Sequence, residues 1–233
     1  MAGGWRVSCL SMSSVPKRVE QLMAQASGDE KHDPSAHSTL DILWVLYDRI
    51  LRYDPRDPRG EDRDRFLMSK GHGPLALFAI LADKGFFPAE EMARFETWEG
   101  ILGGHPDRHR VPGIEISTGS LGHGFPMAVG VALALRAKGS DRRVFVLIGD
   151  GEANEGSVWE TALLAGSLEL PHLTAILVDN ASSTRPLGDI GAKFSTFGWA
   201  ARTANGRDHE ALYAALSAPD AVRPTIVVAE IRE

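Results

Sequence analysis

The sequence predicts an α/β fold of three layers, α/β/α, with helices on both faces of a central, mainly parallel sheet. Residues 144–148 and 173–178 are short, almost wholly apolar runs, which is typical of fully buried strands. A helical pattern lies between them, at about 154–168, and stops before Pro171. A strand, helix and strand in this order form a crossover that places the two strands parallel and adjacent.

The remaining elements follow from apolar periodicity and from capping and breaking residues. Helices are expected at about 15–25, 38–51, 74–84, 89–99, 126–138 and 210–216, and strands at 65–68, 114–117 and 225–231. Ser38 or Thr39 is a plausible cap for the second helix. Core-facing positions are expected at Leu40, Leu43, Trp44 and Tyr47, and at Val158, Trp159, Ala162, Leu163 and Ala165. Residues 54–65 carry dense mixed charge and are expected to form a solvated loop.

Composition narrows the class of protein. The 233 residues suit one large domain or two small ones, and a hydrophobic fraction of 43% is ample for a core. A net charge of −6 argues against a nucleic-acid surface. The single cysteine, Cys9, excludes a disulfide framework and a cysteine-rich zinc site. No apolar run has the length of a membrane span, so a cytoplasmic protein is expected, with residues 1–14 as an uncertain extension of a domain at 15–233.

Polar residues follow the two central strands. In an open parallel sheet, ligands bind at the carboxyl edge, where Asp150 and Asn180 are expected. Gly149 and Gly151 would let the backbone approach a diphosphate, and the next helix N-terminus favours an anion. Asp150 would repel a bare diphosphate, however. A hard divalent cation resolves this conflict if it is shared by the carboxylate, an amide oxygen and a backbone carbonyl, for which the carbonyl near Ser182 is a candidate. The dinucleotide fingerprint and the P-loop are both absent.

This stretch resembles a known family. GDG, then Glu155-Gly156, an alanine-rich helix and VDN, with Asn180 lying 180 − 150 = 30 residues after Asp150, resembles transketolase, a thiamine diphosphate enzyme. The resemblance implies thiamine diphosphate and Mg²⁺ as cofactors. It places cofactor contacts at Gly149, Asp150, Gly151 and Asn180 and metal ligands at Asp150, Asn180 and Ser182. The alternative is an ordinary buried crossover with a glycine turn and a solvated acidic helix start.

A second glycine-rich loop carries the same resemblance. TGSLGHG at 118–124 is similar to the family's T-G-S-L-G-Q-G, whose backbone lines the thiamine. The cofactor contacts that this implies are Gly119, Ser120, Leu121 and His123. His123 stands where the family has Gln, which makes the position titratable near neutral pH. The alternative is a simple helix-entry turn.

The expected catalytic residues are three histidines and a glutamate. SKGHG at 69–73 and GGHPD at 103–107 resemble family motifs that place His72 and His105 in the site. Counting back from Asp41 aligns His32 with the histidine of S-G-H-P-G-x-x-L-S-x-x-D-I-L. Solvated loop residues, or a zinc site formed by the three histidines, are the alternatives. Glu155 matches the family's glutamate that reaches the partner's cofactor-activating Glu, against the alternative of a helix-dipole carboxylate.

The resemblance covers about 15–231 and corresponds only to the family's N-terminal domain. With Glu233 directly after the last strand, the pyrimidine-binding domain is expected on a separate C-terminal subunit. The implied function is the N-terminal subunit of a split transketolase, a heterotetramer that moves a two-carbon ketol unit between sugar phosphates. The alternatives are a subunit similar to 1-deoxyxylulose-5-phosphate synthase, another pathway-specific thiamine diphosphate transferase subunit, or a non-catalytic assembly subunit.

Overall fold

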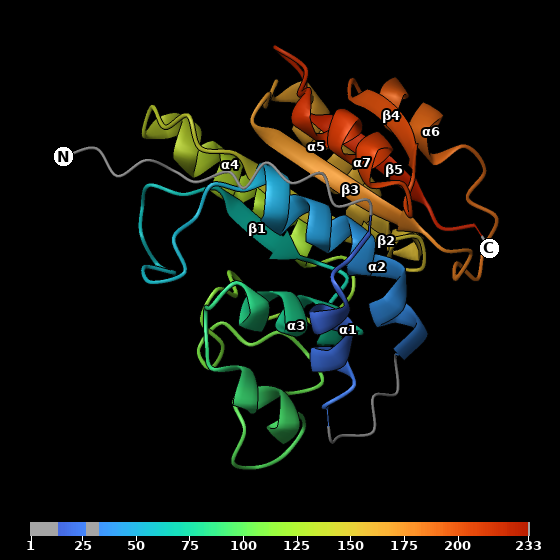
Figure 1. The fold of residues 1–233 in the computed structure, drawn as a ribbon. Helices are drawn as coiled ribbons and strands as arrows, with labels where there is room; N and C mark the ends of the chain where they lie inside the picture. The colour runs from blue at the N-terminus through green and yellow to red at the C-terminus, as the bar shows by residue number, and fades with distance from the viewer. Residues whose placement is uncertain (1–13, 27–32, 233) are drawn as a thin grey trace.

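A sheet of five parallel strands forms the centre of the molecule (Figure 1). The computed structural model describes residues 14–26 and 33–232. The strands, in chain order, are β1 (Arg65–Met68), β2 (Val144–Gly149), β3 (Leu173–Asp179), β4 (Ala200–Asn205) and β5 (Thr225–Glu230). Their order in the sheet is β1-β2-β3-β5-β4, and every neighbouring pair is parallel. All five strands therefore end at one edge, as the sequence predicted for β2 and β3.

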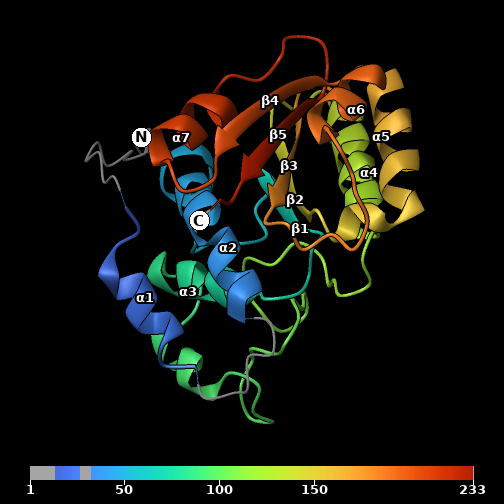
Figure 2. The same cartoon turned by 90° about the vertical axis from the view of Figure 1, so that its right-hand side faces the viewer.

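Helices cover both faces of this sheet, so the predicted three layers are confirmed (Figure 2). One face carries α2 (Asp33–Val45) and α7 (His209–Ser217), with α3 (Leu75–Asp83) and α1 (Lys17–Met23) packed against α2. The other face carries α4 (Gly124–Ala137), α5 (Gly156–Ser167) and α6 (Ile190–Thr196). No helix in the described part of the chain is long and apolar enough to cross a membrane.

Successive residues of a strand point to opposite faces of the sheet and so belong alternately to the two hydrophobic cores. Phe145 and Leu147 of β2 belong to the core beneath α2 and α3, whereas Val146 and Ile148 belong to the core beneath α4 and α5. Both sets are fully buried, which is why β2 reads as a continuous apolar run. The edge strand β4 is different: its sequence, AARTAN, is mostly half-buried or exposed. It lacks an apolar run, and the sequence did not predict it.

The second helix begins earlier than expected. It starts at Asp33, with Pro34 in its first turn, where proline is favoured. Ser38 and Thr39 are therefore interior residues and not caps. Their hydroxyls donate to the carbonyls of the residues three positions before them, at 2.8 and 2.9 Å. The predicted core positions from Leu40 to Tyr47 are buried, and a π-helical turn, η1 (Leu46–Ile50), completes the element.

Three further expectations are wrong. Residues 89–99 form only a 3-10 turn, η2 (Ala89–Arg94), because the backbone becomes extended at Phe95, where ψ is 131°. Residues 114–117 form no strand. The chain continues into a loop tied to Pro106 and Met68 through Thr118 instead. In α5 the buried face is shifted, so that the Leu163 side chain is 57% exposed.

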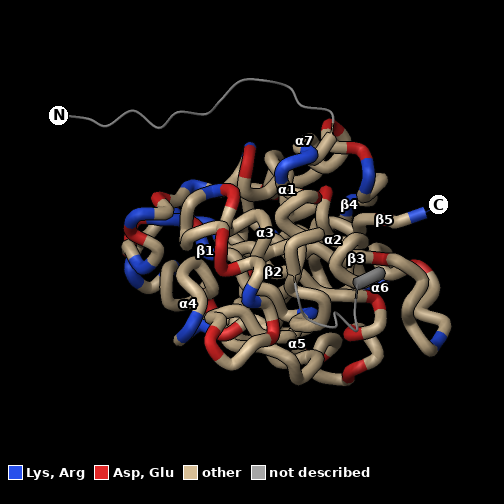
Figure 3. The backbone as a smooth tube through the Cα atoms, turned by 60° about the horizontal axis from the view of Figure 1, so that its bottom comes forward, with Lys and Arg blue, Asp and Glu red and all other residues tan. Residues whose placement is uncertain are grey.

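The mixed-charge loop conceals a buried carboxylate. Asp64 accepts hydrogen bonds from the backbone and guanidinium groups of both Arg52 and Arg143, with Arg143 Nη2 at 2.7 Å. Burial would raise the pKa of Asp64, but the bonds from Arg143 and Arg52 outweigh it and lower that pKa. Figure 3 shows basic and acidic segments interleaved beside β1 and α4. Lys138–Glu61 and Arg142–Asp62 are further ion pairs in this region.

Candidate functional site

Three turns meet at the carboxyl edge on one buried side chain, Glu152, which is 2% exposed. Its Oε1 accepts from Ser69 Oγ at 2.5 Å and from Gly122 N at 2.9 Å, and its Oε2 accepts from Gly149 N at 3.2 Å. Burial raises the pKa of Glu152, and these three bonds oppose the rise. Glu152 thus joins the SKGHG turn after β1, the TGSLGHG loop and the GDG turn after β2. The sequence reasoning assigned it no such role, although it lies inside the GDGE motif.

Glycines let the first two of these turns touch backbone to backbone. A Cβ on Gly71 would lie 2.8 Å from the backbone nitrogen of Gly119, and Gly71 also has a φ of +61°. A Cβ on Gly119 would lie 2.9 Å from His105 Cδ2. Both distances are shorter than side-chain contacts allow, so glycine is required for this contact. The predicted cofactor loop therefore packs directly against two of the predicted histidine turns.

Asp150 follows β2 and is 1% exposed. Its Oδ1 accepts from Gly151 N at 2.8 Å and from Ser182 Oγ at 2.5 Å, and its Oδ2 accepts from Ser183 N at 3.0 Å. A carboxylate has about four acceptor positions, so one remains on Oδ2. The structure therefore brings Asp150, Gly151 and Ser182 together, as the predicted metal site requires.

Asn180 follows β3 at the same edge. Its Nδ2 donates to Ser38 Oγ at 3.2 Å, whereas its Oδ1 is buried and has no hydrogen-bond partner among the described residues. A buried acceptor without a partner is unfavourable unless a ligand satisfies it. A cation bound beside Asp150 would do so.

The oxygen atoms that remain available as ligands at this edge suit Mg²⁺. Asp150 Oδ2 and Asn180 Oδ1 are both oxygens, which hard cations prefer, and the Ser182 carbonyl lies beside Gly151, 3.7 Å from where a Gly151 Cβ would be. Among residues 14–26 and 33–232, no three His, Cys, Asp or Glu side chains are grouped as a metal site. Within that part of the chain, the alternative of a zinc site formed by histidines gains no support.

Two of the predicted histidines lie together. The rings of His72 and His105 are edge to face, with centroids 5.1 Å apart, and His72 Nδ1 lies 3.3 Å from the Lys70 carbonyl oxygen. His123 is exposed at the start of α4, with Nδ1 3.0 Å from the Leu121 oxygen. The prediction for His32 falls outside the described residues.

Glu155 borders the TGSLGHG loop from the other side. It is the exposed N-cap residue of α5, and its side chain makes no capping hydrogen bond. A Cβ on Gly122 would lie 2.9 Å from Glu155 Cβ, so the two segments are in contact. Its exposure and the absence of a capping hydrogen bond are compatible with the predicted role at a partner interface. Ser120 is exposed and Leu121 half-buried on the same loop.

Lys70 is a further buried group that the sequence reasoning left without a role. It is 7% exposed, and its Nζ donates to the Ser35 carbonyl at 3.0 Å and to Ser38 Oγ at 3.3 Å. Burial lowers the pKa of Lys70 to about 8, an effect opposed by the charges of Asp150 and Glu152. Its aliphatic stem crosses Gly149, where a Cβ would lie 3.5 Å from Lys70 Cδ. The space beside Gly149 is therefore occupied by Lys70.

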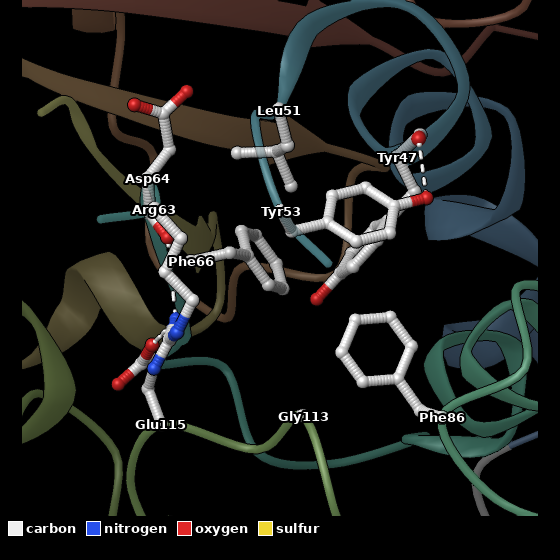
Figure 4. A pocket seen from close by; sticks show the side chains of 9 residues that line it. All are labelled: Tyr47, Leu51, Tyr53, Arg63, Asp64, Phe66, Phe86, Gly113 and Glu115. Carbon is white, nitrogen blue, oxygen red and sulfur yellow. Dashed lines mark hydrogen bonds and ion pairs between the residues drawn. The ribbon is translucent and has the colours of Figure 1, made fainter. Parts of the chain in front are cut away.

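An aromatic pocket lies away from this edge, near the amino end of β1 (Figure 4). Tyr47, Tyr53, Phe66 and Phe86 line it with edge-to-face and tilted rings. Two of its charged side chains, Arg63 and Glu115, form an ion pair with each other. The Tyr53 hydroxyl donates a hydrogen bond to the Tyr47 carbonyl. None of the residues predicted for cofactor or metal binding lines this pocket.

Comparison with protein families gives one match over nearly the whole chain. Residues 18–231 match the family model described as transketolase, thiamine diphosphate binding domain.

Among curated proteins, the chain is 48% identical to ferredoxin fas2 of Rhodococcoides fascians, covering 90% of this chain and 70% of the relative. It is 38% identical to an apulose-4-phosphate transketolase subunit of Actinobacillus succinogenes, covering 76% and 67%. It is 37% identical to the 6-deoxy-6-sulfo-D-fructose transketolase subunit SqwG of a Clostridium species, covering 79% and 70%.

Among solved structures, a Pichia stipitis transketolase in complex with fructose 6-phosphate matches with a TM-score of 0.74 at 28% identity. The match covers 86% of this chain but only 36% of that protein, so the chain spans about a third of the solved transketolase.

Proposed function

This chain belongs to the transketolase family, whose thiamine diphosphate-binding domain it carries, and we propose that it acts as the N-terminal subunit of a split transketolase. The observation that carries the proposal is a pair of oxygens with acceptor positions left at the edge where the two glycine-rich motifs meet: Asp150 Oδ2, which accepts one hydrogen bond, and Asn180 Oδ1, which accepts none from the described residues. Its reaction is the transfer of a two-carbon ketol unit between sugar phosphates.

The residues of this edge have distinct roles in the proposal. Asp150, Asn180 and the Ser182 carbonyl would hold Mg²⁺, and the turn at Gly151 would approach the diphosphate. The predicted diphosphate contact at Gly149 gains no support, because its N–H donates to Glu152 and Lys70 fills the space beside it. The backbone of the TGSLGHG loop, from Gly119 to His123, lines the thiamine. Bound thiamine diphosphate supplies the carbanion chemistry, while the protein orients and tunes it.

The substrate side is formed by histidines. His72 and His105 lie together on the Gly119 side of the cofactor loop, where they can hold donor hydroxyl groups, and His32 is assigned to the same group. Glu155, exposed beside Gly122, reaches the partner subunit.

We propose a partner subunit because two relatives are named as transketolase subunits. The chain covers about two thirds or more of the length of each. The partner holds the aminopyrimidine ring, and the active sites lie between the two kinds of chain in a heterotetramer. We place the assembly in the cytoplasm, and we propose residues 15–233 as a single domain.

The sugar for which the relatives are named differs between them. One relative is named for apulose 4-phosphate and another for 6-deoxy-6-sulfo-D-fructose, so substrate choice varies within this group. The relative named as a ferredoxin does not suggest electron transfer by this chain, because iron–sulfur clusters are held by about four cysteines and the sequence has one.

A transfer assay tests the proposal. The purified chain is assayed with thiamine diphosphate, Mg²⁺, fructose 6-phosphate as a ketose phosphate donor and a panel of aldose acceptors, with and without a candidate C-terminal subunit that carries a pyrimidine-binding domain. We expect turnover only when both chains are present, and its loss with His72→Ala or His105→Ala. Robust turnover by the chain alone, unchanged by the partner, would refute the split enzyme. A stable complex that binds cofactor but transfers nothing to any acceptor would favour a non-catalytic role in assembly.

A further inference from the structure

One hydroxyl group connects Lys70 to the predicted metal ligand Asn180. Ser38 Oγ donates its single hydrogen to the Ser35 carbonyl at 2.8 Å. Its two lone pairs are then available as acceptors, and two donors approach them: Lys70 Nζ at 3.3 Å and Asn180 Nδ2 at 3.2 Å. Ser38 is 4% exposed and Lys70 7%, so water hardly competes for these positions.

This arrangement decides which end of the Asn180 amide faces the site. With its hydrogen turned to Ser35, Ser38 Oγ can accept from an amide NH₂ but would meet an amide oxygen lone pair against lone pair. Asn180 Nδ2 is therefore held at Ser38, and Oδ1 is the atom left without a partner among the described residues. A flipped amide would present two N–H donors to a cation instead of an oxygen.

Lys70 supports the same orientation of the Asn180 amide. Its ammonium group has donors and no acceptor, and it contacts both Ser38 Oγ and the Ser35 carbonyl. The Lys70 ammonium group, Ser38 Oγ and the Ser35 carbonyl form a closed triangle of hydrogen bonds that holds the Ser38 hydroxyl in place. Lys70 lies on the turn after β1, Ser38 on α2 and Asn180 after β3, so the two bonds to Ser38 Oγ tie three elements together at the carboxyl edge.

We propose that Lys70 and Ser38 are positioning residues for metal binding: through Ser38 Oγ they orient the Asn180 amide so that its oxygen faces the cation. The inference rests on the function proposed above. It predicts that Ser38→Ala raises the Mg²⁺ concentration needed for half-maximal thiamine diphosphate binding about fivefold, the effect of losing one hydrogen bond. Lys70→Met, which keeps the aliphatic stem over Gly149, is expected to raise it about threefold.

The sign of the Lys70 effect separates this role from a direct one. If the ammonium acted on Mg²⁺ only through its charge, removing it would lower the Mg²⁺ requirement, because like charges repel. If it bound the diphosphate directly, Lys70→Met would weaken cofactor binding by the same factor whether or not Ser38 is present. The positioning role predicts that Lys70→Met adds nothing in the Ser38→Ala background.

Thr39→Ala is the matched control. Thr39 is the next residue of α2, is equally buried, and makes the same kind of bond to a carbonyl three residues back, but no bond to Asn180 or Lys70 is found among the described contacts. It should lose similar stability and keep the wild-type Mg²⁺ requirement. Equal Mg²⁺ requirements for Ser38→Ala, Thr39→Ala and the wild type, measured by calorimetry on the full chain, would overturn the inference.

A metal-free measurement keeps the result independent of the cofactor. The side-chain NH₂ signals of Asn180, assigned by their loss in Asn180→Asp, should exchange slowly with solvent in the wild type and in Thr39→Ala, and rapidly in Ser38→Ala. Rapid exchange in the wild type would overturn the inference. Absence of any Mg²⁺-dependent cofactor binding by the wild type, with slow Asn180 exchange retained, would count against the proposed function and leave the Ser38 contact established.

Discussion

Asp64 and Asp150 are buried carboxylates at opposite ends of the same pair of strands, and their partners differ. Asp64 immediately precedes β1 and accepts from two arginines, so its charge is neutralised and its oxygens are saturated. Asp150 immediately follows β2 and, among the described residues, accepts hydrogen bonds from neutral groups, those of Ser182, Ser183 and Gly151. Beside it, Asn180 Oδ1 lacks a hydrogen-bond partner among the described residues.

The difference separates a stabilising cluster, Asp64 with Arg52 and Arg143, from the proposed binding cluster, Asp150 with Asn180. Removing one partner of a buried carboxylate–arginine pair is strongly destabilising, because it leaves an uncompensated charge. A carboxylate with neutral donors keeps its negative charge available, and a free amide oxygen beside it offers a second ligand for a cation. We therefore expect substitution of Asp64 to lower stability while sparing cofactor binding. Substitution of Asp150 should weaken cofactor binding with a smaller loss of stability.

The largest effect is expected at the binding cluster. Asp150→Ala and Asn180→Ala should each abolish the gain in thiamine diphosphate affinity that Mg²⁺ provides, because each removes a predicted metal ligand. Titration calorimetry with and without Mg²⁺ measures this gain directly. Asp64→Ala is the control and should keep the full gain in its folded fraction. Retention of the gain in both site variants would show that the metal binds elsewhere.

The next largest effect is expected at the stabilising cluster. Asp64→Ala should lower the free energy of unfolding by about 3 kcal/mol, since it removes the buried carboxylate that two arginines share. The value is at the low end for a buried pair because Arg52 and Arg143 are themselves 37% and 22% exposed. Urea unfolding followed by tryptophan fluorescence measures the change. An equally large loss in Asp150→Ala would remove the distinction between the two clusters.

A smaller effect is expected for Glu155, which lies beside the binding cluster without belonging to it. Glu155→Gln should leave the Mg²⁺ requirement unchanged and lower turnover of the assembled enzyme about tenfold, through loss of a carboxylate at the partner interface. Glu160→Gln, an exposed change one turn further along α5, serves as the control and should keep full turnover. Weaker Mg²⁺ binding with normal turnover at saturating metal would contradict this role.

The smallest effect is a pH dependence of stability from Asp64. Its pKa is lowered in the folded state from 3.8, so its contribution is complete above that value and is lost as the pH falls through the folded-state pKa. The difference in unfolding free energy between the wild type and Asp64→Asn should therefore be constant from pH 7 to about 5 and shrink at lower pH. Urea unfolding at several pH values tests this. A difference that grows as the pH falls would contradict the pairing.

Local sequence was enough to place Asp150 and Asn180 at the carboxyl edge of the sheet. The runs at β2 and β3 are apolar because both faces of those strands are covered, and Asp150 and Asn180 directly follow them. The stabilising end could not be predicted in this way, because Arg143 meets Asp64 across 79 positions of chain. The edge strand β4 was missed because its exposed face carries polar residues and alanine.

Within the candidate site, several contacts join residues that are distant in the sequence, and the motifs alone could not predict them. Ser38 was expected to cap a helix, yet it lies inside α2 and contacts Asn180, 142 positions away. Glu152 and Lys70 lie within recognised motifs, but their partners come from other turns, so only the folded chain shows what they hold.

The most direct test of the binding cluster is the dependence of cofactor binding on metal in the wild-type chain. Thiamine diphosphate is titrated into the purified protein by calorimetry, once in the presence of EDTA and once with saturating Mg²⁺. Because Asp150 repels a diphosphate unless a cation lies between them, binding should be weak with EDTA and at least about tenfold tighter with Mg²⁺. Equal affinity under the two conditions would contradict the assignment of Asp150 and Asn180 to a metal site.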